Sequence, residues 1–169
     1  MSARQSYVLD TNTIIDLHCA KLLSKVFQLP CDFSVTDSLA DEFLNPPFQV
    51  LKELGLCFEP LTSEEIGKIR VLMATYSKPS FYDISVLVLA QSKKTVLITG
   101  DEALRNAAAD NSVDCRGTCW LIDYLANERI ITYTEAIAAY NVILKKPRFP
   151  PKDECKALLI IWKQRQKLE

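Results

Sequence analysis

The residues in this sequence best suited to chemistry are acids placed where apolar segments end. Asp10 directly follows the apolar run at residues 7–9, and Thr11, Asn12 and Thr13 come straight after it. A turn from a strand into a helix needs one polar residue to cap the helix, and here there are four. This surplus of polar groups requires either a structural or a chemical reason.

Two more acids stand at similar positions. Asp101 comes after Thr99 and Gly100 at the end of the apolar run 95–98, and Asp83 is the third residue after Ser80, just before the apolar segment 84–90. Each of these acids can be explained as a helix cap, because helix N-termini favour negative charge. Taken singly, none of them requires a catalytic role.

Glu42 is harder to explain as a cap. It lies three residues after Leu39 and next to Phe43, which places it at the border of the buried face of a predicted helix, whereas Asp41 points further away. A carboxylate in such a half-buried position costs free energy unless it is paired or binds a metal ion. The sequence therefore singles out Glu42 rather than its neighbour.

The elements that position these acids follow an alternating pattern. Short apolar runs, each typical of a strand, alternate with segments of helical length, and this alternation predicts a parallel sheet covered by helices. The spacing Thr62 to Glu65 predicts a capping box at one helix start. The predicted strands lie at residues 7–9, 32–35, 57–58, 95–98 and 113–115, and later helices at 101–109, 118–127 and 134–144.

In a parallel sheet the ends of the strands at Leu9 and Ile98 lie at the same edge, so Asp10 and Asp101 should converge there. The helix that begins at Ser80 must run back along the sheet, which places Asp83 near the same edge. Carboxylates that converge repel each other, and a divalent cation relieves that repulsion. With oxygen ligands only, the expected ion is Mg²⁺ or Mn²⁺.

Four segments in this order resemble the PIN domain, and more narrowly the ribonucleases of VapC-type toxin–antitoxin pairs: VLDTNTIIDL, the helix with Glu42, SFYDISVLVLAQ and LITGDEALRNAA. The likeness covers roughly residues 6–128. It implies a three-layer α/β/α fold with a central parallel sheet of about five strands. It also implies metal-dependent RNA cleavage, with catalytic metal ligands at Asp10, Glu42, Asp83 and Asp101 and with Thr11, Asn12 and Thr99 orienting them.

The resulting hypothesis is an endoribonuclease that hydrolyses RNA phosphodiester bonds with Mg²⁺ or Mn²⁺, as the toxin of a toxin–antitoxin pair. Lys93, Lys94 and Arg105 are candidate contacts to RNA phosphates. An antitoxin protein and a second copy of the chain are the partners that the resemblance implies. The alternative is a catalytically inactive PIN-like module that binds RNA or protein. A phosphatase of the haloacid dehalogenase type is disfavoured, because its second acid would fall at Asn12.

The charge distribution divides the chain in two. Residues 1–144, the predicted nuclease domain, carry 12 Lys and Arg against 18 Asp and Glu, whereas residues 145–169 carry 8 against 3. We expect the second part to be a basic C-terminal helical extension that packs on the same domain or on a partner. Leu158, Leu159 and Trp162 form its predicted apolar stripe.

The remaining features point to an ordinary soluble protein. Six cysteines are scattered through apolar segments of a chain without a signal peptide, which predicts free thiols and a cytoplasmic location. No apolar run approaches the roughly 18 residues of a membrane span, so no membrane partner is expected. The four glycines form no phosphate-binding loop, which excludes the common nucleotide-binding fingerprints.

Overall fold

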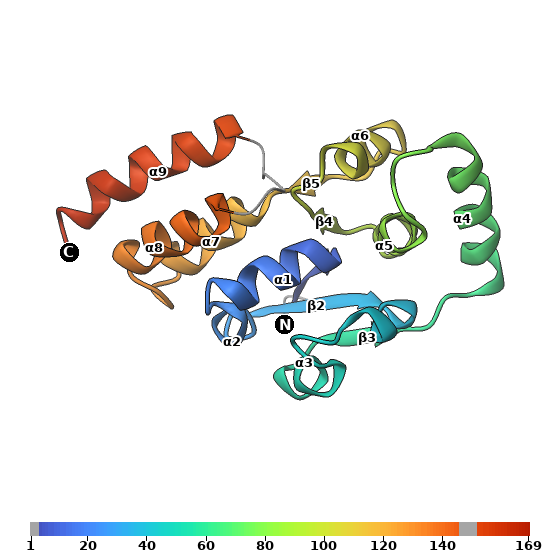
Figure 1. Cartoon of the computed structure of the whole chain (residues 1–169), viewed down its shortest axis with the longest axis horizontal. Coiled ribbons are helices and arrows are strands. Elements are labelled where there is room, and N and C mark those ends of the chain that lie inside the picture. The colour runs from blue at the N-terminus through green and yellow to red at the C-terminus, as the bar shows by residue number, and fades with distance from the viewer. Residues whose placement is uncertain (1–3, 146–151) are drawn as a thin grey trace.

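A five-stranded parallel sheet forms the centre of the protein, as a computed structural model that describes residues 4–145 and 152–169 shows (Figure 1). Its strand order is β3-β2-β1-β4-β5. The strands are β1 (Gln5–Leu9), β2 (Cys31–Thr36), β3 (Cys57–Glu59), β4 (Val96–Ile98) and β5 (Cys115–Arg116). The predicted fold class is confirmed, and four of the predicted strands lie where expected, whereas the fifth, predicted at residues 113–115, begins only at Cys115.

Helix α5 (Phe81–Lys93) covers one face of the sheet, where it packs against β1, β2 and β4. Residues 84–90 are all buried, as expected for a helix that is apolar on nearly every side. Helix α4 (Ser63–Thr75) packs on the outside of α5. Both helices begin with a capping box, Thr62 with Glu65 and Ser80 with Asp83, so these predicted helix starts are confirmed.

On the other face the ring of Trp120, from α7 (Thr118–Asn127), lies 5.5 Å from that of Tyr7 in β1. Helix α7 also contacts α1 (Thr11–Cys19) and α2 (Leu23–Val26). The remaining connections are the 3₁₀ helix η1 (Asp37–Glu42), α3 (Phe48–Leu54) and α6 (Glu102–Asp110). Helices on both faces give the three layers of the fold.

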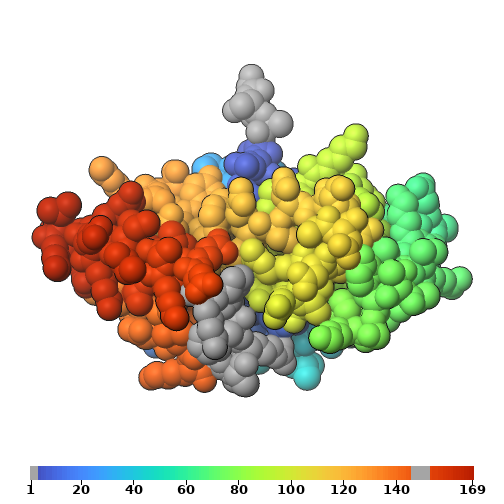
Figure 2. Space-filling view, turned by 90° about the horizontal axis from the view of Figure 1, so that it is seen from above, coloured from blue at the N-terminus to red at the C-terminus, as the bar shows by residue number. Residues whose placement is uncertain are grey.

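The C-terminal helices lie at one end of the molecule, opposite α4 (Figure 2). Helix α9 (Lys152–Gln166) packs on α7 and on α8 (Tyr133–Leu144). Trp162 is fully buried there, and its Nε1 donates a hydrogen bond to Asp123 Oδ1 at 2.7 Å. Residues 146–151, which belong to the predicted extension, lie outside the described residues. No helix in the described part of the chain is both long and apolar enough to span a membrane.

One prediction about the cysteines is wrong. Cys119 of α7 and Cys155 of α9 form a disulfide, with their Cα atoms 5.6 Å apart. The two residues are 36 positions apart in the sequence, and they meet only because α9 folds back on α7. Cys19, Cys31, Cys57 and Cys115 are free thiols, as predicted.

Candidate active site

Asp10 occupies the centre of the candidate site, at the carboxyl end of β1. Its backbone N–H donates to Ile98 O of the neighbouring strand β4 at 3.2 Å. Its side chain is the N-cap of α1, with Oδ1 accepting from the backbone N–H of Thr13 at 2.7 Å, and only 1% of the residue is exposed. Asp10 is therefore a helix cap and a buried carboxylate at once.

Thr99 joins Asp10 to the next acid. The Thr99 hydroxyl donates to Asp10 Oδ2. The oxygen of that hydroxyl, Thr99 Oγ1, in turn accepts from the backbone N–H of Asp101 at 3.1 Å. Asp101 in turn caps α6, with Oδ1 accepting from Leu104 N at 2.7 Å. The two acids that the sequence placed at one sheet edge are thus joined through a single buried hydroxyl.

Asp83 lies in the first turn of α5 and faces the same edge. Its Oδ2 accepts from the Ser80 backbone N–H at 2.7 Å, so this carboxylate completes a capping box. Its charge acts on Asp10 and helps to raise the pKa of that group. The two carboxylates are therefore close enough to repel each other, as the geometric argument from the sequence expects.

Glu42 requires a correction. It is the last residue of a 3₁₀ helix rather than part of an α-helix, and it is exposed rather than half-buried. The turn stays short because Pro46 and Pro47 follow within five residues and lack the N–H that a continuing helix needs. Glu42 nevertheless reaches the site, because Thr11 Oγ1 donates to its Oε2 at 3.0 Å.

Thr11 therefore orients Glu42 and not Asp10, whereas Thr99 contacts Asp10 directly. Asn12 lies next to Thr11 in the first turn of α1. The residue that the sequence reasoning left out is Thr13, whose N–H holds Asp10 and whose hydroxyl donates to Ile98 O at 3.2 Å. The spacing from the N-cap to the third helical residue is the signal that could have identified it.

The electrostatics of the site centre on Asp10. The pKa of this carboxyl is raised from its ordinary 3.8 to about 6, chiefly by burial and to a smaller extent by the charge of Asp83, while hydrogen bonds from Thr13 and Thr99 oppose the rise. Ionising Asp10 in the folded protein is therefore costly. A positive charge bound next to it would recover that cost.

The side chains of the four candidate metal ligands, Asp10, Glu42, Asp83 and Asp101, offer only carboxylate oxygens. Oxygen ligands of this kind fit Mg²⁺ or Mn²⁺. Among residues 4–145 and 152–169, however, no three acidic, histidine or cysteine side chains are arranged so that one cation could contact them together. The reason is local: Asp83 and Asp101 turn their carboxylates toward the N–H groups of their own helices. To bind a cation, the Asp83 and Asp101 carboxylates would have to contact the ion with oxygens that now accept hydrogen bonds from backbone N–H groups, or with their second oxygens.

The three predicted RNA contacts separate in space. Lys93 forms an ion pair with Glu59, and Lys94 lies beside Gln5 and Ser6 at the beginning of β1, the opposite end from Asp10. Arg105 stays next to the acids, with Nη1 donating to Thr99 O at 3.1 Å. Its position alone among the three is compatible with a contact to a phosphate at the candidate site.

Comparison with known families agrees with this geometry. The chain matches the model of a family described as a PIN domain over residues 6–163, which includes most of α9. The protein belongs to the PIN domain family, a nuclease-like family whose members typically use divalent metal ions. A search of curated proteins found no match to the chain.

Proposed function

We propose that this protein is a metal-dependent endoribonuclease. The observation that carries the proposal is the buried Asp10 carboxylate, which Thr99 links to the backbone N–H of Asp101 at the carboxyl edge of the sheet and on which the charge of Asp83 in α5 acts. Acids that repel each other in one place are expensive to maintain. Binding of a cation and of the phosphate that it attracts offsets this cost.

Asp10, Asp83 and Asp101 would hold Mg²⁺ or Mn²⁺, with Glu42 at the margin. When bound, the ion would lower the pKa of a water molecule and neutralise charge on the scissile phosphate. The protein's own contribution is positional. Thr99 fixes the rotamer of Asp10, the first turn of α1 holds the other Asp10 oxygen, and Thr11 orients Glu42.

The test uses a 5′-labelled single-stranded RNA and DNA of the same sequence. The wild-type protein should cleave the RNA with Mg²⁺ or Mn²⁺ and lose this activity in EDTA. The Asp10→Asn variant should be slower by about 100-fold or more, because about 3 kcal/mol of lost transition-state stabilisation corresponds to two decades in rate. Asp41→Asn, which removes an exposed acid next to Glu42, is the matched control and should retain activity.

Two results would contradict the proposal. One is cleavage that persists unchanged in Asp10→Asn, which would point to a contaminating nuclease or to another site. The other is cleavage of the DNA in preference to the RNA. The resemblance to PIN ribonucleases implies products with a 5′-phosphate and a 3′-hydroxyl, so analysis of the product ends adds an independent check.

A second candidate is a PIN-like module that binds RNA or protein without cutting it. The observation in its favour is that, in the part of the chain that the structure describes, the acids serve as helix caps and do not form a ready-made cation site. Thermal unfolding with added Mn²⁺ separates the two candidates, because an ion that binds only the folded state raises the melting temperature. No rise in melting temperature and no cleavage, together with retained RNA binding, would favour the inactive module.

The toxin role, an antitoxin partner, a homodimer and a cytoplasmic location remain predictions from the sequence. A neighbouring gene for a small DNA-binding protein would support the toxin role. Sedimentation of the purified protein would test the dimer directly.

A further inference from the structure

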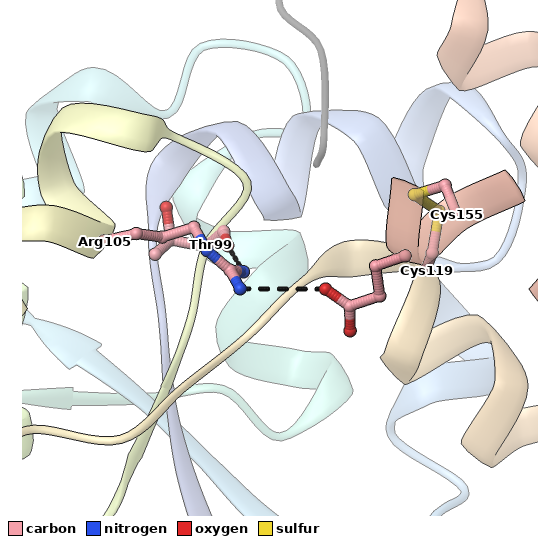
Figure 3. The surroundings of a disulfide bond; sticks show 5 residues. Thr99, Arg105, Cys119 and Cys155 are labelled. Atoms are coloured by element: carbon pink, nitrogen blue, oxygen red, sulfur yellow. Dashed lines mark hydrogen bonds and ion pairs between the residues drawn. A yellow bond between two sulfur atoms is a disulfide. The ribbon is translucent and has the colours of Figure 1, made fainter. Parts of the chain in front are cut away.

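Arg105 contacts Thr99 of the candidate site on one side and extends toward the helix α9 that carries Cys155 on the other (Figure 3). Its guanidinium donates through Nη1 to the carbonyl of Thr99. In the sequence, Thr99 precedes the candidate ligand Asp101 by two residues. The pKa of the nearby Cys115 thiol is raised to about 11, chiefly by burial; the Arg105 charge lowers this pKa and the Asp10 charge raises it, so both charges act on the same thiol. Arg105 is thus a fixed cation close to the acids.

The free edge of this guanidinium faces an acid from α9. Arg105 Nη2 lies 3.7 Å from Glu154 Oε2, and the two side chains are only 26% and 33% exposed. The distance is longer than that of a hydrogen-bonded ion pair, so the two groups attract each other without a tight contact. Such a pair can be displaced by a stronger anion.

The backbone at Glu154 is held firmly in place. The next residue, Cys155, is 2% exposed and is joined by the disulfide to Cys119 of α7, and Trp162 anchors the helix two turns further on. Glu154 therefore cannot move away by fraying of the helix start while the disulfide is intact. Asp153, its neighbour in the same turn, is exposed, and Glu154 is the one that faces Arg105.

We propose that Glu154 is an affinity-determining residue that occupies Arg105 in the place of an RNA phosphate, and that the Cys119–Cys155 disulfide holds it there. This inference rests on the proposed function, because it assumes that RNA approaches the acids past Arg105. A guanidinium with one edge on the Thr99 carbonyl has further N–H donors for a phosphate. Glu154 competes for them, so it weakens binding and limits retention of the product.

Removing this competition has a defined expected size. A partly exposed ion pair of this kind is weak, so Glu154→Gln should tighten RNA binding only about two- to fivefold. One additional phosphate contact should also steepen the dependence of binding on salt, by about 0.7 in the slope of log affinity against log salt for a single strand. Asp153→Asn removes the same charge from the same turn without releasing Arg105, and should change neither quantity as much.

The experiment measures binding of a fluorescent single-stranded RNA by anisotropy, in EDTA to stop metal-dependent cleavage, at several salt concentrations. The full-length wild type is compared with Glu154→Gln, Asp153→Asn, Arg105→Gln and the double variant Arg105→Gln with Glu154→Gln. The double variant should bind like Arg105→Gln alone, because Glu154 acts through Arg105. Wild-type protein whose disulfide has been reduced by a small dithiol should bind RNA more like Glu154→Gln. Labelling should show two free thiols more than in the oxidised protein, because Cys19, Cys31, Cys57 and Cys115 are already free.

The outcomes separate this inference from the proposed function. If the wild type cleaves RNA with metal but Glu154→Gln and Asp153→Asn bind alike, the role of Glu154 is wrong and the nuclease stands. If Glu154→Gln binds more tightly but no variant cleaves, the inference holds for an RNA-binding protein and the nuclease is wrong. If no variant binds or cleaves RNA, both are wrong.

Discussion

The buried Asp10 carboxylate makes a quantitative prediction about stability. In the unfolded chain this group has its ordinary pKa of 3.8, and in the folded protein the pKa is about 6. The folded state therefore binds the proton more tightly, which stabilises it fully below pH 3.8, and this contribution is lost as the pH rises through about 6. A difference of about two pH units corresponds to about 3 kcal/mol.

Replacing Asp10 with Asn removes the charge but keeps an oxygen that can accept from the Thr13 N–H. Without metal, the Asp10→Asn variant should thus exceed the wild type in free energy of unfolding by up to about 3 kcal/mol above pH 7. The advantage should shrink steadily between pH 6 and 4, within the interval between the two pKa values.

The assay is urea unfolding in EDTA at pH values from 4 to 8, with wild type, Asp10→Asn and the control Asp41→Asn. The control removes an exposed acid and should change the free energy of unfolding by no more than about 0.5 kcal/mol at any pH. A stability difference between wild type and Asp10→Asn that does not depend on pH would refute the argument that burial of the charge is costly. Added Mn²⁺ should stabilise the wild type and not the variant.

Three further outcomes follow from named contacts. Glu42→Gln should lower the rate of RNA cleavage more than Asp41→Asn, because Thr11 holds Glu42 toward the site. An equal loss of cleavage rate in the two variants would show that this orientation is unimportant. Thr99→Val should lower cleavage about 10- to 100-fold in steady-state assays while retaining metal binding, since the hydroxyl that orients Asp10 is lost. Trp162→Ala should cost about 3–5 kcal/mol in urea unfolding, because this buried ring joins α9 to α7, and a loss below 1 kcal/mol would show that the disulfide alone holds the helix.

The sequence by itself predicted a parallel sheet of about five strands, most of the longer helices and the capping positions of three acids. These inferences succeeded because their causes are local. Asp10, Asp83 and Asp101 each bond to a backbone N–H three residues away in the chain, and capping of this kind can be recognised from spacing alone. Topology then required the ends of adjacent parallel strands to meet, which brought Asp10 and Asp101 together.

Only the tertiary structure decided which side chains meet across the chain. Three pairs of side chains in contact are separated by 31 or more positions in the sequence: Thr11 with Glu42, Arg105 with Glu154, and Cys119 with Cys155. No local pattern distinguishes these partners from their neighbours. The docking of α9 on α7 results from packing of whole elements, to which many residues contribute small free energies. For this reason the sequence located the carboxylates of the candidate site and named Arg105 as a candidate phosphate contact, whereas Glu154, the acid that faces Arg105, became visible only in the fold.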